Sequence, residues 1–388
     1  MDRQIVHMDL DAFYVSCTLL KMPELAGRPL IIGGTSNRGV VTSASYEARK
    51  YGIQAAMPMR VALQRCPDAT VLKGDFDLFT RYSNTVNEII TEHAPIHERA
   101  SIDEFYVDMS GMDRFFGSLQ FTKELVHRVQ KETGLPMSFG LSVNKTVAKM
   151  CTNYAKPLGR LHILHNEVQP FLDPQSIRSL PSLGDVTYKL LRRIRIKIIE
   201  TLRQVPADSM KELLGKNGLR LSEKANGIDN TPIIPYTERK SISTEKTFIK
   251  DTQDLKELRA LLLAMVEKVT FQLRTANMMC STLTVRIRYT NRDTETMQKK
   301  IAFTSSDEVL IPIAYELFEK LYQRRMLLRL VGVKLSGMVR GNHQIDLFED
   351  NIKMIRLYEA MDRMKRRFKN PVLIRRATGF STFDRKTA

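Results

Sequence analysis

The chain has 388 residues, of which 43% are hydrophobic and 27% are charged, a composition typical of globular proteins. This length allows roughly two to four domains and excludes a disulfide-stabilised miniprotein. The 60 Lys and Arg residues exceed the 43 Asp and Glu residues, so the formal net charge is +17. Such an excess favours a polyanionic partner such as nucleic acid, with an acidic membrane surface as the rival partner.

The sequence predicts no membrane-spanning segment. Its longest apolar run, residues 260–266, is flanked by Arg259 and Glu267 and is far shorter than the ~20 residues that a span needs. The start of the chain lacks the features of a secretory signal peptide. The four cysteines lie far apart without a C-x-x-C pair, which disfavours a disulfide framework or a zinc site. We therefore expect a cytoplasmic protein with reduced thiols.

In the first 165 residues, short apolar runs bounded by turn residues alternate with segments of helical periodicity. Strands are expected at 5–11, 29–34, 40–43 and 136–142, and helices at 76–93 and 119–133. Residues 100–108 surround an acidic pair and are expected to hold two strands that meet at a tight turn. This alternation predicts an α/β or α+β core.

Strand signals vanish between residues 166 and 232, where prolines separate short helical segments and predict a small helical domain. Two prolines and several polar residues then mark 233–240 as a linker. Beyond it, strands are expected at 243–249, 281–290, 296–303 and 328–338, and helices at 254–277 and 307–325. The basic tail retains apolar residues between 352 and 380, which suggest another helix.

Two acidic pairs are the candidates for chemistry. Asp9 and Asp11 end an apolar strand, and strand alternation puts them on one face. Asp103 and Glu104 lie at the expected turn, so both reach one site only if the turn bends the chain. Each pair alone also fits an exposed strand end or an ordinary turn. Together, carboxylates on one sheet fit oxygen coordination of Mg²⁺ and favour two-metal phosphoryl transfer.

A triphosphate substrate requires cationic and hydroxyl groups near these acids. The candidates are Ser43, Tyr46, Arg49 and Lys156. Arg can hold phosphate oxygens in a planar fork, whereas Lys acts as a point charge. For Arg49, a solvated helix face is the competing interpretation.

Five motifs occur in the order and approximate spacing of the Y-family translesion DNA polymerases: HMDLDAFY, SASYEARKYGI, ASIDEFYVDMSG, SFGLSVNKTVAKM and NYAKPLG. The chain most resembles the DNA polymerase IV branch of that family, and the similarity continues through KSISTEKTF to cover at least residues 5–340. The resemblance implies an α+β multidomain, right-hand polymerase fold. Its expected parts are a palm (1–11 and 75–165), small fingers (12–74), a helical thumb (166–232), a linker (233–240), an α+β little finger (241–340) and a basic tail (341–388).

The resemblance also implies roles for individual residues. Asp9, Asp103 and Glu104 would bind two Mg²⁺ ions, with the Leu10 carbonyl as a further ligand and Asp11 in a structural role. Tyr14 would be the steric gate that excludes a ribose 2′-hydroxyl. The residues that would bind the incoming nucleotide are Phe13, Tyr14, Ser43, Tyr46, Arg49 and Lys156.

The expected DNA contacts lie in the thumb and the little finger. In the thumb hairpin LPSLG, Ser182 replaces the usual glycine, and Arg195 also occupies a position where glycine is common, which puts close backbone approach to phosphate in doubt. In the little finger, Arg286 and Arg288 alternate with apolar residues, so one strand face offers cations to a duplex backbone. Lys240 is expected to join them; a merely exposed sheet face is the alternative.

The tail contains QIDLF, which resembles the pentapeptide that binds a sliding clamp, with Gln344, Leu347 and Phe348 as the anchors.

The resemblance thus implies a monomeric, template-directed DNA polymerase. It would use primer-template DNA, deoxynucleoside triphosphates and Mg²⁺ in translesion synthesis and DNA repair, without proofreading. A nucleotidyl cyclase and a catalytically silent, clamp-bound scaffold are the alternatives. The motifs do not predict which lesion is bypassed.

Overall fold

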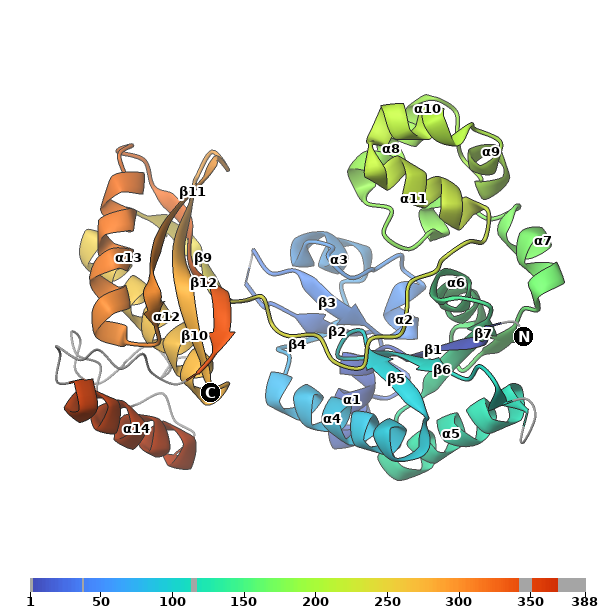
Figure 1. Cartoon of the computed structure of the whole chain (residues 1–388), viewed down its shortest axis with the longest axis horizontal. Coiled ribbons are helices and arrows are strands. Elements are labelled where there is room, and N and C mark those ends of the chain that lie inside the picture. Colours follow the sequence, from blue (N-terminus) through green and yellow to red (C-terminus); the bar gives the residue numbers. More distant parts are fainter. Residues whose placement is uncertain (1–2, 37, 113–116, 342–350, 369–388) are drawn as a thin grey trace. The chain divides into compact units, whose positions relative to one another are not determined.

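The computed structural model in Figure 1 describes residues 3–36, 38–112, 117–341 and 351–368. The chain divides into two units, Met1–Thr237 and Glu238–Ala388, and each unit has its own sheets, helices and buried core. The division falls inside the segment 233–240 that the sequence marks as a linker.

A five-stranded sheet forms the centre of the first unit, in the order β5-β6-β1-β7-β8. Its middle strand, β1 (Ile5–Leu10), is antiparallel to both neighbours, and all six of its residues are buried. A strand with both faces covered is expected to be buried in this way. The other strands are β5 (Ile96–Arg99), β6 (Glu104–Asp108), β7 (Met137–Ser142) and β8 (Arg160–His162).

Helices cover both faces of this sheet. Val6, Met8 and Leu10 of β1 belong to the large core that α4 (Phe76–His93) and α5 (Ser118–Thr133) complete. The alternate residues of β1 face α6 (Lys145–Ala155), whose Ala148 packs on Ile5. Figure 1 shows α4 and α5 on one side of the sheet and α6 on the other. Strand alternation therefore separates an apolar face from a face that carries His7 and Asp9.

A smaller sheet, in the order β3-β2-β4, lies between α1 and α4 in the chain. Its strands are β2 (Leu30–Gly33), β3 (Val41–Ala44) and β4 (Thr70–Leu72). The accompanying helices are α1 (Phe13–Lys21), the 3-10 helix Pro23–Leu25, α2 (Tyr46–Arg49) and α3 (Met59–Arg65). The side chain of Ser45 caps α2 by accepting a hydrogen bond from the Ala48 amide.

Between β8 and the second unit, all residues are described and the elements are helical, as the sequence predicts. They are the 3-10 helices His165–Glu167 and Ile177–Ser179 and the α-helices α7 (Val168–Leu172), α8 (Asp185–Arg193), α9 (Ile199–Arg203), α10 (Ala207–Leu214) and α11 (Lys216–Ala225). Ser182 and Arg195, which replace expected glycines, have φ angles of 72° and 65°. The backbone thus keeps the left-handed conformation that favours glycine, although both residues carry side chains.

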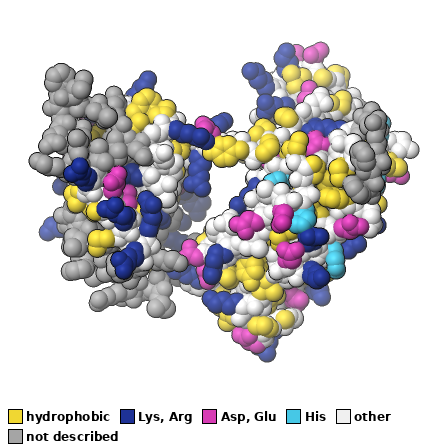
Figure 2. Space-filling view, turned by 60° about the horizontal axis from the view of Figure 1, so that its bottom comes forward, with side chains coloured by type: hydrophobic (Ala, Val, Ile, Leu, Met, Phe, Trp, Pro, Cys, Tyr) yellow, Lys and Arg dark blue, Asp and Glu magenta, His cyan; other side chains and the backbone are white. Residues whose placement is uncertain are grey.

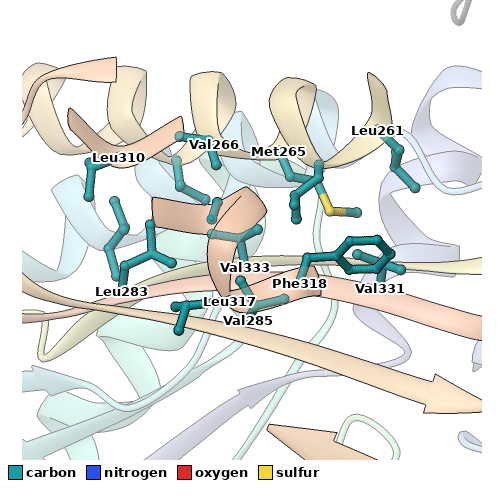
Figure 3. Close-up of a cluster of buried hydrophobic side chains, with 14 of the residues drawn as sticks. Leu261, Met265, Val266, Leu283, Val285, Leu310, Leu317, Phe318, Val331 and Val333 are labelled. Atoms are coloured by element: carbon teal, nitrogen blue, oxygen red, sulfur yellow. The ribbon is translucent and has the colours of Figure 1, made fainter. Parts of the chain in front are cut away.

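The second unit is an antiparallel sheet in the order β11-β10-β12-β9, with α12 and α13 packed against it. Figure 3 shows the core between these layers, where Leu261, Met265 and Val266 of α12 meet Leu283 and Val285 of β10. The elements are β9 (Ser241–Thr252), α12 (Leu255–Thr275), β10 (Met278–Tyr289), β11 (Thr294–Thr304), α13 (Asp307–Leu321) and β12 (Leu328–Arg340).

The tail forms the helix α14 (Asn351–Phe368), which packs on the second unit. Arg274 of α12 donates from Nε to Asp362 Oδ2 over 2.7 Å and from Nη1 to Asp307 Oδ1 over 3.0 Å. All three side chains are more than nine-tenths buried. The guanidinium also lies 4.8 Å from the centre of the Tyr358 ring. The predicted clamp-binding residues Gln344, Leu347 and Phe348 lie outside the described residues.

Most expected elements are present, with the following differences. The first strand of the acidic hairpin lies earlier than expected, at β5, and residues 100–103 form the turn itself. Helix α13 ends at Leu321, four residues before the expected end. Helices α1, α3 and α6 and strands β4 and β8 were not predicted, because such short segments give a weak periodic signal. No described helix has the length and apolar character needed to span a membrane.

Candidate active site

Two adjacent strands bring the predicted carboxylates to one end of the central sheet. Asp9 of β1 is the direct cross-strand partner of Glu104 of β6, so their side chains share a face. The Leu10 amide donates to the Asp103 carbonyl over 3.1 Å, which ties the turn before β6 to the end of β1. The structure therefore gathers Asp9, Asp103 and Glu104 as the sequence predicts. The Leu10 carbonyl lies at the same strand end.

The turn that carries Asp103 is held by Ser101. Its Oγ donates to Asp103 Oδ1 over 2.6 Å and accepts hydrogen bonds from the amides of Asp103 and Glu104 at 3.3 and 3.0 Å. Ser83 of α4 donates to the Ile102 carbonyl in the same turn. This turn bends the chain so that two consecutive acids, which a regular strand would point to opposite faces, both reach the site.

Two lysines from α6 and its C-terminal end neutralise the carboxylates. Lys156 Nζ lies 2.5 Å from Asp9 Oδ1, and Lys149 Nζ lies 2.7 Å from both carboxylate oxygens of Glu104. Lys156, predicted to bind the triphosphate, thus sits at the centre of the site. Lys149 was not singled out from the sequence, although Lys145, Lys149 and Lys156 recur at helical spacing.

Burial strongly perturbs Asp9, which is only 4% exposed. Its pKa is raised from 3.8 to about 7, chiefly by desolvation; the charges of Asp103 and Glu104 also raise the pKa, and Lys156 opposes the increase. A carboxyl group with such a pKa binds a proton readily unless a cation takes its place. This is the electrostatic environment expected of a metal ligand or a catalytic acid.

His7 is a further residue of the site, and sequence reasoning missed it. Its side chain is completely buried, and Nδ1 lies 2.9 Å from Thr152 Oγ1 of α6. Burial and the charges of Lys149 and Lys156 lower its pKa well below 6.5, so the ring is neutral at pH 7. The signal was present in HMDLD, because alternation puts residue 7 on the same face as residue 9.

The donor atoms of His7, Asp9 and Glu104 all lie within 4.8 Å of one another, a grouping suited to a metal ion. Carboxylate oxygens are the ligands that hard divalent cations prefer. The residues present therefore fit a divalent cation.

Gly140 of β7 sets how closely α6 approaches the sheet. A Cβ atom at this position would lie 2.3 Å from the Ala148 carbonyl oxygen and 2.5 Å from Cys151 Cβ. Such distances are sterically forbidden, so α6 can pack this closely against β7 only if residue 140 is glycine. The close contact places Lys149 and Thr152 directly over β1 and β6.

Asp11 has the structural surroundings that the sequence predicts for it. It is 1% exposed, and its Oδ2 accepts hydrogen bonds from Ser138 Oγ and the Leu158 amide, each over 2.8 Å. Tyr46 donates to Oδ1 over 3.4 Å. These bonds join β1, β7, α2 and the segment after α6, so Asp11 stabilises the framework around Asp9.

The predicted steric gate, Tyr14, belongs to an aromatic cluster at the start of α1. Its ring centre lies 4.6 Å from that of Phe79 and 5.7 Å from that of Phe76. Burial and the charge of Asp103 raise the pKa of Tyr14, which indicates that the ring lies near the acidic end of the sheet. Phe13, also predicted to bind nucleotide, is only 2% exposed and points into the core. Only its backbone can face a nucleotide.

The other predicted triphosphate ligands lie on β3 and α2. Ser43 is buried on β3, and Tyr46 begins α2. Arg49 is exposed; its Nε donates to the Ala44 carbonyl over 3.0 Å, and its guanidinium lies 4.6 Å from the centre of the Tyr46 ring. Burial and Asp11 raise the pKa of Tyr46 to about 12, so its hydroxyl remains a hydrogen-bond donor.

Strand β10 has the predicted alternation. Leu283, Val285 and Ile287 are fully buried, whereas Arg286 and Arg288 lie on the opposite face. Arg286 donates to Glu245 Oε1 over 3.0 Å, and Arg288 donates to Thr294 Oγ1 over 2.8 Å. The predicted DNA ligand Lys240 is exposed just before β9. Figure 2 shows Lys and Arg side chains across the visible faces of both units.

A sheet that presents clustered carboxylates, joined to a small mixed subdomain, a helical subdomain and a separate α+β unit, is the architecture of a right-hand nucleic-acid polymerase. Among solved structures, a chimeric Y-family DNA polymerase matches with a TM-score of 0.80 and 25% identity, covering 87% of this chain and 100% of its own.

Sequence comparison identifies the family. Residues 8–153 match the impB/mucB/samB family and residues 239–347 match that family's C-terminal domain. DNA polymerase IV of Dehalococcoides mccartyi (strain CBDB1) is 33% identical over 94% of this chain and 95% of its own length. DNA polymerase IV of Halorhodospira halophila is 35% identical over 89% and 98%. The chain therefore belongs to the impB/mucB/samB family of Y-type DNA polymerases.

These findings confirm the predictions of family, right-hand fold and activity. The chain is a DNA-directed DNA polymerase of the translesion type and depends on divalent metal ions.

Proposed function

We propose that Asp9, Asp103, Glu104 and the Leu10 carbonyl hold two Mg²⁺ ions at the end of β1. The observation that carries the proposal is the cross-strand pairing of Asp9 with Glu104, together with the bond that ties Asp103 to Leu10. When bound, such ions activate the primer 3′-hydroxyl and neutralise charge on the leaving pyrophosphate.

Lys156 and Lys149 prepare this site for its charged ligands. In the structure their ammonium groups balance Asp9 and Glu104, which would otherwise be uncompensated charges in a half-buried site. Lys156 is then available to transfer its contact from Asp9 to a phosphate of the incoming nucleotide. Ser43, Tyr46 and Arg49 supply the remaining triphosphate contacts, and the exposed Arg49 has the freedom to reach them.

Tyr14 excludes ribonucleotides by shape. Its ring is braced by Phe76 and Phe79, so it cannot yield easily to a 2′-hydroxyl. The backbone at Phe13 completes the floor of the nucleotide site.

The rest of the chain binds DNA and partners. The palm (1–11 and 75–165), fingers (12–74), thumb (166–232), linker (233–240), little finger (241–340) and tail (341–388) are assigned from the motifs. Lys240, Arg286 and Arg288 contact duplex phosphates, which gives salt-dependent affinity without sequence preference. Gln344, Leu347 and Phe348 bind a sliding clamp.

We infer that the polymerase works as a monomer in the cytoplasm and synthesises DNA without proofreading. Its four cysteines are all free and buried, which fits a reducing compartment. Errors therefore persist unless another protein removes them.

Primer extension on an undamaged template with Mg²⁺ tests the site. Single-nucleotide addition is expected to be lost in the double variant Asp103→Ala plus Glu104→Ala. A matched control, Glu88→Ala plus Glu92→Ala, removes the same charge from the exposed face of α4 and should extend like the native chain. Extension by the first variant contradicts the proposed site. Salt-sensitive DNA binding without extension by the native chain would favour the silent scaffold.

A further inference from the structure

Arg286 lies on the face of the second unit's sheet that is turned away from α12 and α13. Its neighbours in β10, Val285 and Ile287, are fully buried in the core that these helices cover. Strand alternation therefore puts Arg286 on the other face. Across the sheet, Arg286 is in register with Gly332 of β12, and Gly332 is in register with Glu245 of β9. These three residues thus form one row on the face that carries the predicted DNA contacts.

Gly332 lets Glu245 reach Arg286 across the strand that separates them. Neighbouring strands lie about 4.8 Å apart, so the backbones of β9 and β10 are separated by roughly 10 Å. Arg286 Nη1 nevertheless donates to Glu245 Oε1 over 3.0 Å. A Cβ atom at residue 332 would lie 2.6 Å from Glu245 Cγ and 3.3 Å from Glu245 Cβ. The Glu245 side chain therefore occupies the space that a side chain on residue 332 would fill.

Glu245 puts a negative charge among residues that otherwise suit a polyanion. The two neighbouring rows of this face, which the structure describes completely, contain no acid. Their members are Ser243, Lys334, Thr284 and Gln298 in one row and Thr247, Leu330, Arg288 and Thr294 in the other. A carboxylate at the centre of such a surface opposes the approach of phosphate groups.

The bond to Glu245 satisfies only part of the Arg286 guanidinium. Its Nη1 donates to Glu245, whereas its Nε is buried and has no hydrogen-bond partner among the residues that the structure describes. A guanidinium binds a phosphate through two N–H groups in a planar fork, which is a more complete contact. The side chains of Arg286 and Glu245 are also 43% and 40% exposed. Water and salt therefore screen their attraction, so Arg286 can leave Glu245 at little cost.

We propose that Glu245 competes with duplex phosphate for Arg286 and so weakens the hold of the second unit on DNA. The inference rests on the proposed function, because it takes Arg286 to be a phosphate contact. When DNA binds, the guanidinium exchanges the Glu245 carboxylate for a phosphate group, and the carboxylate is left beside the duplex. Its charge then lowers the affinity for DNA of any sequence, because phosphate contacts carry no sequence information.

Fluorescence anisotropy of a labelled primer-template duplex, titrated with the full chain between about 50 and 200 mM salt, tests the proposal. E245Q keeps the size of the side chain and an acceptor oxygen but removes the charge. It should bind the duplex at least about threefold more tightly than the native chain, and the slope of log affinity against log salt should be steeper by about one. The control E319Q also neutralises the acid of an exposed Glu–Arg pair, in which Arg259 lies 2.6 Å from Glu319, but on α13. It should bind like the native chain.

The variant R286A, made alone and together with E245Q, shows whether the effect passes through Arg286. Loss of Arg286 should weaken binding by a factor at least about threefold larger in the E245Q background than in the native chain. Affinity of E245Q equal to or below that of the native chain overturns the proposal. If R286A weakens binding equally in both backgrounds, or less in E245Q, the phosphate contact stands and the competition fails. If R286A has no effect in either background, the phosphate contact in the proposed function fails, and the competition fails with it.

Discussion

Replacing Asp9 by Asn is expected to stabilise the cation-free chain at pH 8, although it should abolish polymerase activity. The Asp9 carboxyl group has its pKa raised from 3.8 to about 7, chiefly by burial. At pH 8 the folded chain therefore holds an ionised carboxylate at a site that favours the protonated form. Asn has nearly the same size and carries no charge.

The direction in which the free energy of unfolding changes with pH follows from the number of protons that Asp9 binds in the folded and in the unfolded chain. Below pH 3.8 the carboxyl is protonated in both states, and above about pH 7 it is ionised in both. Between these values the folded chain binds more protons than the unfolded chain, so its free energy of unfolding falls as pH rises. Each unit of pKa shift corresponds to about 1.4 kcal/mol. Above pH 7, ionised Asp9 therefore lowers the free energy of unfolding by at most roughly 4 kcal/mol. Burial of the Asn amide offsets about 1–2 kcal/mol of the gain.

Thermal unfolding between pH 5 and 8, followed by circular dichroism with a chelator present, measures the effect. A net gain of about 2 kcal/mol at pH 8 should raise the Tm of the first unit by roughly 4–8 °C. His7 opposes this trend in both proteins, since its lowered pKa costs stability as pH falls below 6.5. The difference between the two profiles removes that contribution. A difference that does not change with pH would refute the assignment of the raised pKa to Asp9.

Three other predictions follow from packing and charge. Tyr14→Ala should raise ribonucleotide use relative to deoxynucleotide use at least about tenfold in kcat/KM, and an unchanged ratio would remove Tyr14 as the gate. Ser182→Gly should stabilise the first unit by about 1 kcal/mol in urea unfolding, because φ at this position is 72°; a loss of stability would argue against the strained turn. Arg274→Met leaves Asp307 and Asp362 buried and unpaired, so the second unit should lose about 3 kcal/mol, and unaltered unfolding would show that α14 does not pack there.

The sequence predicts the acidic part of the site well, because local rules determine it. Asp9 and Asp11 follow a continuous apolar run, so their place at the end of a buried strand needs no tertiary information. Asp103 and Glu104 are more demanding, since both reach the site only through the turn that Ser101 holds. The chemistry of carboxylates on one sheet suggested that the two pairs share a metal site, and the motif resemblance then implied which of the acids bind the ions.

The positions of the lysines and the role of His7 depend on tertiary contacts, which the spacing of residues along the sequence does not predict. Lys149 reaches Glu104 only because α6 crosses the sheet at β1 and β7, and no local pattern predicts that crossing. His7 was visible as a neighbour of Asp9 on the same face. Its unpaired nitrogen, however, becomes evident only when the position of Thr152 is known.

Gly140 has a consequence for how this enzyme can be damaged. The residue lies on β7 and has no side chain to bind a cation, a nucleotide or DNA. Yet a single added methyl group would collide with the Ala148 carbonyl and lift α6 from the sheet. The ammonium group of Lys149 and the hydroxyl of Thr152 would move with the helix, away from Glu104 and His7. A random-mutagenesis screen scored by primer extension should therefore recover inactive variants at position 140. In these variants all side chains of the active site are still present, but those on α6 are displaced from those on the sheet.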